Sequence, residues 1–244
     1  MPLSTPLLEA DGVARRFGAL LVLDGVDFQL ATGEAVGVVG PNGAGKTTLL
    51  SILAGSLRPT SGRVRYQGVD VTGVRADRRC RLGIARTHQV PRPFVGMTVF
   101  ENVLVGAMLG AGHRRAGAYE RTVDVLATCG LIDLANRRAA DLGLLDRKRL
   151  ELARALATNP HVLFLDEIGG GLTDGEALEL VHTIKQFRER GIAVIWIEHI
   201  VHVLIQAIDR LVCLDAGRII ADGPPREVLA DAAVIDAYLG AAAP

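Results

Sequence analysis

At positions 40–47 the chain reads Gly40-Pro41-Asn42-Gly43-Ala44-Gly45-Lys46-Thr47, which matches the pattern G-x-x-x-x-G-K-[ST]. The apolar run 35–39 before it predicts a buried strand, and residues 47–54 after it have the apolar spacing of a helix. Glycines let backbone N–H groups turn toward a phosphate, and the helix N-terminus adds a partial positive charge. Strand, loop and helix together therefore predict a nucleoside triphosphate site rather than a chance glycine-rich turn.

The chemistry of phosphoryl transfer gives two residues of this loop separate tasks. Lys46 is expected to reach the β- and γ-phosphates, and the Thr47 hydroxyl is expected to occupy one position on Mg²⁺. The predicted ATP-binding residues are Gly40, Pro41, Asn42, Gly43, Ala44, Gly45, Lys46, Thr47 and Thr48.

Composition narrows the class of protein. The 244 residues favour one domain with subdomains, and an apolar content of 49% is sufficient for a sizeable core. Lys plus Arg equals Asp plus Glu at 27 each, which argues against a nucleic-acid partner. The 3 cysteines form no C-x-x-C pair, no apolar run is long enough to span a bilayer, and the N-terminus lacks a signal-peptide pattern. These features predict a cytoplasmic protein, and they leave open its attachment to a membrane through a partner.

The order of predicted elements indicates a mostly parallel α/β sheet with two additions. Buried strands at 162–165 and 192–197 alternate with helices, among them 147–158 and a helix opened by a capping box at Thr173 and Glu176. Alternating segments within about 7–35 and 62–71 predict an antiparallel β part, and about 91–155 predicts a helical part. We expect these parts to form a single domain over 1–244.

Two carboxylates follow the apolar strand 162–165. Asp166 is predicted to contact Mg²⁺, directly or through water, and Glu167 to polarise the attacking water, because ligands of α/β sheets bind at the carboxyl ends of strands. The alternative is a pair that only caps the next element. Gln89 and His199 also follow predicted strands, and each alone is compatible with a structural role.

With these residues in order, the chain resembles the ATP-binding subunits of ABC transporters, over nearly its whole length. Within that family it is similar to the branched-chain amino acid uptake group. The similar segments are Ile84–Gln89, Gly96–Gly106, Leu150–Thr158 and Ala237–Gly240. The resemblance implies the ABC ATPase fold, in which a RecA-like P-loop core carries an antiparallel β subdomain and an α-helical subdomain.

The resemblance also implies further site residues and partners. Phe17 aligns with an aromatic residue that stacks on adenine, unless it is a core residue; Gln89 would contact Mg²⁺ and sense the γ-phosphate. His199 would hold the γ-phosphate and water, and the dimer loop would be Gly171, Leu172 and Thr173. The implied assembly is an ATPase dimer with two ATP molecules at its interface, two membrane permeases and a soluble substrate-binding protein, on the inner face of the cell membrane.

The sequence departs from the family at the signature that completes the partner's ATP site. The family reads Leu-Ser-Gly-Gly-Gln or a near variant, whereas this chain has Leu142, Gly143, Leu144, Leu145 and Asp146. The serine hydroxyl is absent, Leu145 is expected to obstruct close approach of the backbone, and Asp146 is expected to cap the following helix. A second departure, Ile168-Gly169-Gly170-Gly171, predicts a loop that is more mobile than in the family. We therefore expect a heterodimer with an unlike ATPase subunit.

Two functions remain after this comparison. The first is the energy-coupling ATPase of an importer for branched-chain amino acids or related amino acid and amide solutes, with ATP and Mg²⁺ as ligands and a low rate without its partner. The alternative is a soluble ABC-type regulator switched by nucleotide, with weak hydrolysis. A repair or translation ABC protein would need a coiled coil, zinc hook or tandem domain, and the sequence has none of these.

Overall fold

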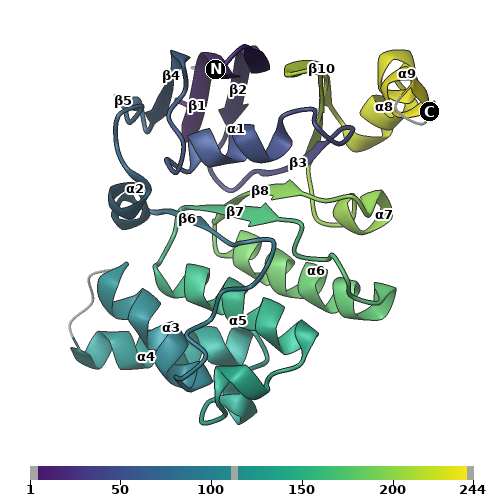
Figure 1. Ribbon diagram of the computed structural model, residues 1–244. Coiled ribbons are helices and arrows are strands. Elements are labelled where there is room, and N and C mark those ends of the chain that lie inside the picture. The colour runs from purple at the N-terminus through teal and green to yellow at the C-terminus, as the bar shows by residue number, and fades with distance from the viewer. Residues whose placement is uncertain (1–4, 111–114, 241–244) are drawn as a thin grey trace.

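A mostly parallel six-stranded sheet forms the centre of the computed structural model, which describes residues 5–110 and 115–240 (Figure 1). The strand order is β10-β9-β3-β8-β7-β6, and each neighbouring pair is parallel except the β9–β10 hairpin. The strands are β3 (Ala35–Val39), β6 (Ile84–Arg86), β7 (Val162–Asp166), β8 (Ala193–Ile197), β9 (Arg210–Asp215) and β10 (Arg218–Gly223). This sheet confirms the predicted α/β core.

A second, antiparallel sheet covers one face of the first, with helix α1 (Lys46–Leu53) between them (Figure 1). Its order is β2-β1-β4-β5. The strands are β1 (Leu8–Phe17), β2 (Leu20–Leu30), β4 (Ser61–Tyr66) and β5 (Val69–Asp70). Two of them come from the region 62–71, where polar and apolar residues alternate as they must when one face of a sheet is buried.

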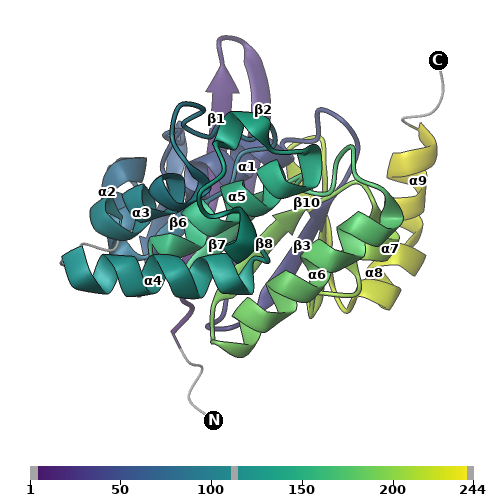
Figure 2. The same cartoon turned by 90° about the horizontal axis from the view of Figure 1, so that it is seen from below.

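Helices cover the opposite face of the central sheet, where Figure 2 shows α4, α5 and α6 in front of the strands. The helices of this layer are α3 (Val99–Leu109), α4 (Arg115–Thr128), η1 (Ile132–Leu134), η2 (Ala139–Asp141), α5 (Leu144–Ala157) and α6 (Asp174–Glu189). At the edges lie α2 (Ala76–Leu82), α7 (Val201–Leu204), α8 (Pro225–Ala230) and α9 (Ala232–Gly240). None of the helices described here combines the length and apolar character that crossing a bilayer requires.

The central strands separate two hydrophobic cores. Leu163 and Leu165 face the helical layer, whereas Phe164 faces α1 and the antiparallel sheet, because successive side chains of a strand point to opposite sides. Both faces are covered, so β7 and β8 are buried along their length and read as continuous apolar runs. Trp196 lies in this core, as its position in the apolar run predicts.

Arg79 is completely buried, although it lies in the arginine-rich stretch 75–81, a pattern that is typical of a solvated helix face. Its guanidinium donates to the carbonyl oxygens of Ile52 at 2.9 Å and Leu53 at 2.7 Å, at the end of α1, where carbonyl groups lack helical partners. Burial lowers the pKa of Arg79 to about 10. The pattern of charges in the sequence does not show that an arginine binds the last carbonyl groups of a helix elsewhere in the chain.

Candidate functional site

The phosphate loop joins the buried strand β3 to α1, and its glycines have conformations that side chains rarely adopt. Gly40 has φ 143°, and a Cβ there would lie 1.9 Å from the carbonyl oxygen of Leu214. Gly45 has φ 105°, and a Cβ there would lie 2.7 Å from a methyl carbon of Leu23. Because α1 begins at Lys46, its free N–H groups point toward the loop.

Lys46 is held inside the loop by the loop's own backbone. Its Nζ donates to the carbonyl oxygens of Gly40 at 2.6 Å and Pro41 at 2.9 Å. Burial lowers the pKa of Lys46, while Glu167 and Cys213 oppose that shift. An adjoining pocket of about 320 Å³ is lined by Leu20, Val22, residues 42–48 and Glu167. The ammonium therefore sits where it can exchange backbone carbonyls for phosphate oxygens.

Asp166 ends β7 in a buried position beside the phosphate loop. One carboxylate oxygen, Oδ2, accepts a hydrogen bond from Arg86 Nη2 at 2.7 Å, and the other, Oδ1, is buried with no hydrogen-bond partner. Arg86 also donates to the hydroxyl of Ser51 at 2.9 Å, so it joins β6, α1 and β7. A buried carboxylate oxygen without a partner is the donor that a hard divalent cation prefers.

Glu167 receives contacts from two directions. Gln89 Nε2 donates to Oε2 of Glu167, and His199 Nε2 lies 2.9 Å from Oε1. Glu167 itself has φ 47°, a left-handed conformation that costs energy for a residue with a side chain and is frequent at functional sites. The ends of β6, β7 and β8 thus bring together three side chains that are distant in the sequence.

Glu198 is a member of this site that the sequence interpretation missed. Its buried carboxylate accepts hydrogen bonds from the backbone N–H of Gly169 at 2.5 Å and of His199 at 3.2 Å. Burial raises the pKa of Glu198. A Cβ on Gly169 would lie 2.8 Å from Oε1 of Glu198, so this glycine permits a close approach. The available signal was a carboxylate directly after the apolar run of β8.

Lys148 extends the network toward α5. It is buried, and its Nζ donates to the backbone carbonyl of Glu167 at 3.4 Å. Burial lowers the pKa of Lys148, while the negative charges of Glu198 and Glu167 oppose that shift. The first turns of α5 therefore contact the same peptide that carries Glu167.

Comparison with known proteins fits this geometry. The sequence profile of the family described as ABC transporter matches residues 23–169, and one described as Branched-chain amino acid ATP-binding cassette transporter matches residues 218–244. The high-affinity branched-chain amino acid transport ATP-binding protein LivG of Salmonella typhimurium is 36% identical, covering 98% of this chain and 100% of that protein. BraF of Pseudomonas aeruginosa, which has the same description, is also 36% identical, over 98% of this chain and 100% of its own.

Solved structures of ABC transporter ATP-binding cassettes have the same fold as this chain. The ADP conformation of an ATP-binding cassette of an ABC transporter has a TM-score of 0.88 and 30% identity, over 97% of this chain and 100% of that chain. This chain belongs to the ABC transporter ATP-binding family. It is accordingly an ATP hydrolase with the ABC ATPase fold, and ATP is its nucleotide.

The ABC signature segment differs from its sequence interpretation in two respects. Helix α5 begins at Leu144 rather than at 147, so Gly143 is its N-cap and Asp146 lies within the first turn, 3.3 Å from Arg149. Asp146 is therefore not the cap. Leu145 packs against the core, and Leu144 is the exposed side chain. Because α5 starts at Leu144, residue 145 belongs to the helix, and the helical periodicity directs its side chain toward the core.

The dimer loop lies beside this segment. A Cβ on Gly171 would be 3.3 Å from a methyl carbon of Leu144, and Leu172 packs against the core. Thr173 closes the loop by capping α6, accepting from Glu176 N at 3.3 Å while the Glu176 carboxylate accepts from Thr173 N at 2.8 Å. The predicted capping box is confirmed. The segments 142–146 and 171–173 are thus contiguous in the structure.

Phe17 ends β1 opposite Leu20 of β2, at the hairpin that contributes Leu20 and Val22 to the pocket beside the phosphate loop. The residue is 46% exposed, and the Arg15 guanidinium carbon lies 4.5 Å from the centre of its ring. The core alternative for Phe17 is excluded by this exposure. Stacking of Phe17 on adenine stays a prediction.

Proposed function

We propose that this chain is the energy-coupling ATPase subunit of an importer for branched-chain amino acids or related amino acid and amide solutes. Support comes from the branched-chain profile at 218–244 and from relatives such as LivG and BraF, which are described as branched-chain amino acid transport proteins. The alternative, a nucleotide-switched regulator, is not favoured by these relatives. In such an importer the permease and the binding protein select the solute. The ATPase subunit indicates the solute only through its similarity to the branched-chain group.

The observation that carries the catalytic proposal is the pair of contacts on Glu167. With Gln89 on one carboxylate oxygen and His199 on the other, the carboxylate is fixed at the mouth of the phosphate loop. In this proposal Glu167 polarises the attacking water. His199 gives up its contact with Glu167 when ATP binds and then holds the water and the γ-phosphate. Gln89 contacts Mg²⁺, senses the γ-phosphate and connects the core to the helical subdomain. Lys46 neutralises charge on the β- and γ-phosphates.

Mg²⁺ fits the residues present. Thr47 supplies a hydroxyl, Gln89 an amide oxygen and Asp166 the unpartnered buried oxygen Oδ1. The described residues include no cluster of three or more His, Cys, Asp or Glu that would hold an ion alone. In a nucleotide site Mg²⁺ is typically bound by one or two carboxylates together with phosphate oxygens and water. The ion would neutralise charge that develops on the transferred phosphate.

We propose a heterodimer with an unlike ATPase subunit. The segment Leu142–Asp146 faces the partner's nucleotide in this family, and here it lacks the serine hydroxyl and exposes Leu144. The site that receives this segment is therefore the altered one. The site built on this chain's own phosphate loop is complete when the partner supplies an intact signature.

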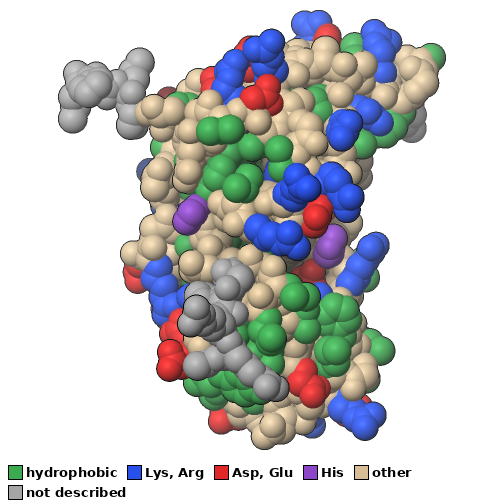
Figure 3. Space-filling model, turned by 90° about the vertical axis from the view of Figure 1, so that its left-hand side faces the viewer, with side chains coloured by type: hydrophobic (Ala, Val, Ile, Leu, Met, Phe, Trp, Pro, Cys, Tyr) green, Lys and Arg blue, Asp and Glu red, His purple; other side chains and the backbone are tan. Residues whose placement is uncertain are grey.

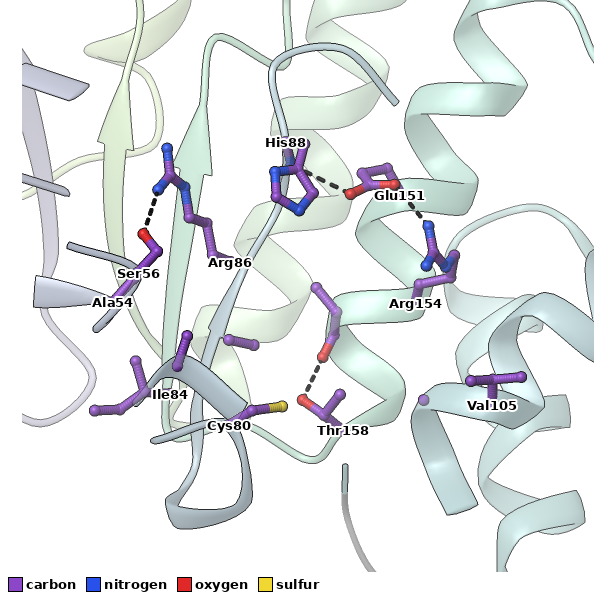
Figure 4. Close-up of a pocket in the computed structure, with 14 residues that line it drawn as sticks. Ala54, Ser56, Cys80, Ile84, Arg86, His88, Val105, Glu151, Arg154 and Thr158 are labelled. Atoms are coloured by element: carbon purple, nitrogen blue, oxygen red, sulfur yellow. Dashed lines mark hydrogen bonds and ion pairs between the residues drawn. The ribbon is translucent and has the colours of Figure 1, made fainter. Parts of the chain in front are cut away.

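The permease surface is proposed at the junction of the core and the helical layer, a face that Figure 3 shows with apolar groups on either side of basic side chains. A groove of about 320 Å³ lies at this junction, and Figure 4 shows Arg86, His88 and Glu151 lining it. Val90, Phe94 and Val95 are exposed on the neighbouring loop. Because Arg86 also contacts Asp166, a permease segment in the groove would adjoin the catalytic centre.

The assembly and its location can be tested together. We expect tagged chain expressed in its natural host to copurify with membrane permeases and a second ATPase subunit, on the cytoplasmic side of the membrane, and to energise uptake of labelled leucine through a soluble binding protein. Uptake of another amino acid or an amide would revise only the solute. Full ATP turnover by a purified homodimer contradicts the heterodimer, and absence of permeases contradicts the transporter function.

A further inference from the structure

The C-terminal helix α9 reaches the phosphate loop. Asp231 starts this helix, since its carboxylate accepts from the backbone N–H of Ala233 at 2.8 Å and its carbonyl accepts from Ile235 N at 3.0 Å. Figure 1 shows α8 and α9 packed together beside β10, at the edge of the molecule. The helix is thus anchored to the edge of the sheet whose next strands lead into the nucleotide site.

One face of α9 points inward. Val234 is buried in the core of the helical layer, and Tyr238 follows it by one helical turn, which places both on the same face. The hydroxyl oxygen of Tyr238 accepts a hydrogen bond from the backbone N–H of Gly40 at 2.8 Å. Burial raises the pKa of the Tyr238 hydroxyl. The contact joins residues that lie 198 positions apart in the chain.

Gly40 is the residue at which the chain leaves the sheet. Val39 opposite Cys213 is the last β3–β9 pair, so the N–H of Gly40 finds its partner in α9 rather than in the ladder. The carbonyl oxygen of Gly40 accepts from Lys46 Nζ at 2.6 Å. The two hydrogen bonds to Gly40 therefore link Tyr238 to the lysine that must turn toward the phosphates.

We propose that Tyr238 is a positioning residue for the phosphate loop, and that α9 thereby sets the affinity for nucleotide. Tyr238 holds the first peptide of the loop, which fixes the starting direction of the N–H groups that receive phosphate. A loop held in its binding conformation loses less entropy when ATP binds. The proposal rests on ATP binding by this family and gives the C-terminal segment a task at the site.

The test is Tyr238→Phe in the full-length chain, with Tyr119→Phe as the matched control. Both substitutions remove one hydroxyl, and the two residues are similarly exposed, 42% for Tyr238 and 45% for Tyr119. We expect Tyr238→Phe to raise the Kd for ATP about fivefold, the usual effect of losing one hydrogen bond. KM for ATP should rise in parallel while kcat changes less than about twofold, because Tyr238 touches neither Glu167 nor His199.

Hydrogen exchange at the Gly40 amide supplies an independent readout. Exchange should accelerate in Tyr238→Phe and remain unchanged in Tyr119→Phe. An unchanged Kd for ATP in Tyr238→Phe, with or without a lower Tm, overturns the proposal, since it leaves the hydroxyl a structural role only. If the wild-type chain failed to bind ATP, the nucleotide function would be wrong, while Gly40 exchange would still decide whether Tyr238 holds the loop.

Discussion

The carboxylate of Glu198 accepts a hydrogen bond from the backbone N–H of Gly169 at 2.5 Å, two residues beyond Glu167. The same carboxylate accepts from the N–H of His199 at 3.2 Å. One buried side chain therefore connects the loop after β7 to the loop after β8. The distance between Glu167 and His199 depends on this connection, because Glu198 holds the N–H of His199 itself and the N–H two residues beyond Glu167.

Removing this carboxylate should impair both stability and turnover. Glu198→Ala leaves the N–H groups of Gly169 and His199 without partners, and unsatisfied buried groups of this kind cost about 1–3 kcal/mol. We expect the free energy of unfolding in urea to fall by that amount and kcat to fall with it. An Ala variant with wild-type stability and kcat would show that the connection does not position the site.

The isosteric variant Glu198→Gln isolates the charge. Burial raises the folded-state pKa of Glu198 above its ordinary value of 4.5, so between these two pKa values the native state binds more protons than the unfolded state. The stability of wild type relative to Glu198→Gln should therefore be greatest below pH 4.5 and decline as pH rises through the raised pKa. Urea unfolding of both proteins across that range measures it, and a constant difference would contradict the assignment.

Glycine at position 169 should be required for the close contact with Glu198. In Gly169→Ala the new Cβ would meet Glu198 Oε1 at 2.8 Å, and we expect a destabilisation of about 1–3 kcal/mol with loss of ATPase activity. Gly175→Ala is the control, because a Cβ there meets no atom within 4 Å and the residue lies in the first turn of α6. Equal effects of the two substitutions in thermal unfolding and turnover assays would refute the explanation.

The ion pair between Arg86 and Asp166 should be strongly coupled, since both side chains are largely buried. Removing one partner of such a pair typically costs about 3–5 kcal/mol, because the other charge is left uncompensated. We expect Arg86→Met to reach the lower part of that range. In a double-mutant cycle with Asp166→Asn, the double variant should lose at least about 1 kcal/mol less stability than the sum of the two single variants. Strict additivity would mean that the pair does not hold Asp166.

Restoring a hydroxyl at the signature should be tolerated by the fold. Gly143 is the N-cap of α5, and a Cβ there meets no atom within 4 Å. Gly143→Ser is expected to stabilise the chain by a few tenths of a kcal/mol, whereas Gly143→Ala is expected to destabilise it. If the missing hydroxyl limits the homodimer, ATP-dependent dimerisation measured by light scattering should increase in Gly143→Ser only. No increase would place the defect at Leu144 instead.

Local patterns in the sequence were sufficient for much of this structure. The phosphate loop, the apolar strand before Asp166 and the capping box at Thr173 each lie within a few consecutive residues, so their physical signals are readable in order. The sequence predicts the start of α5 three residues too late. Aspartate is a common N-cap residue, which favours Asp146, whereas the actual N-cap, Gly143, has no side chain that could indicate its role.

Contacts between distant segments explain the remaining differences. Nothing near Arg79 in the sequence indicates that α1 ends against it, and nothing near Tyr238 indicates Gly40. The burial of Glu198 and Lys148 likewise depends on contacts with the segment 167–169 after β7, which is distant from both in the sequence. Sequence order did place Gln89, Glu167 and His199 at strand ends, and the parallel sheet brings those ends together.

The most direct test of the catalytic centre is ATP hydrolysis with Mg²⁺ by the assembled transporter, comparing wild type with Glu167→Gln in this subunit. Because general-base positioning contributes about 10²–10⁴-fold, turnover at this chain's site should fall at least about 100-fold while the Kd for ATP stays close to wild type. Trapped ATP should then accumulate at that site. Wild-type turnover in Glu167→Gln would contradict the assignment of Glu167 as the residue that activates water.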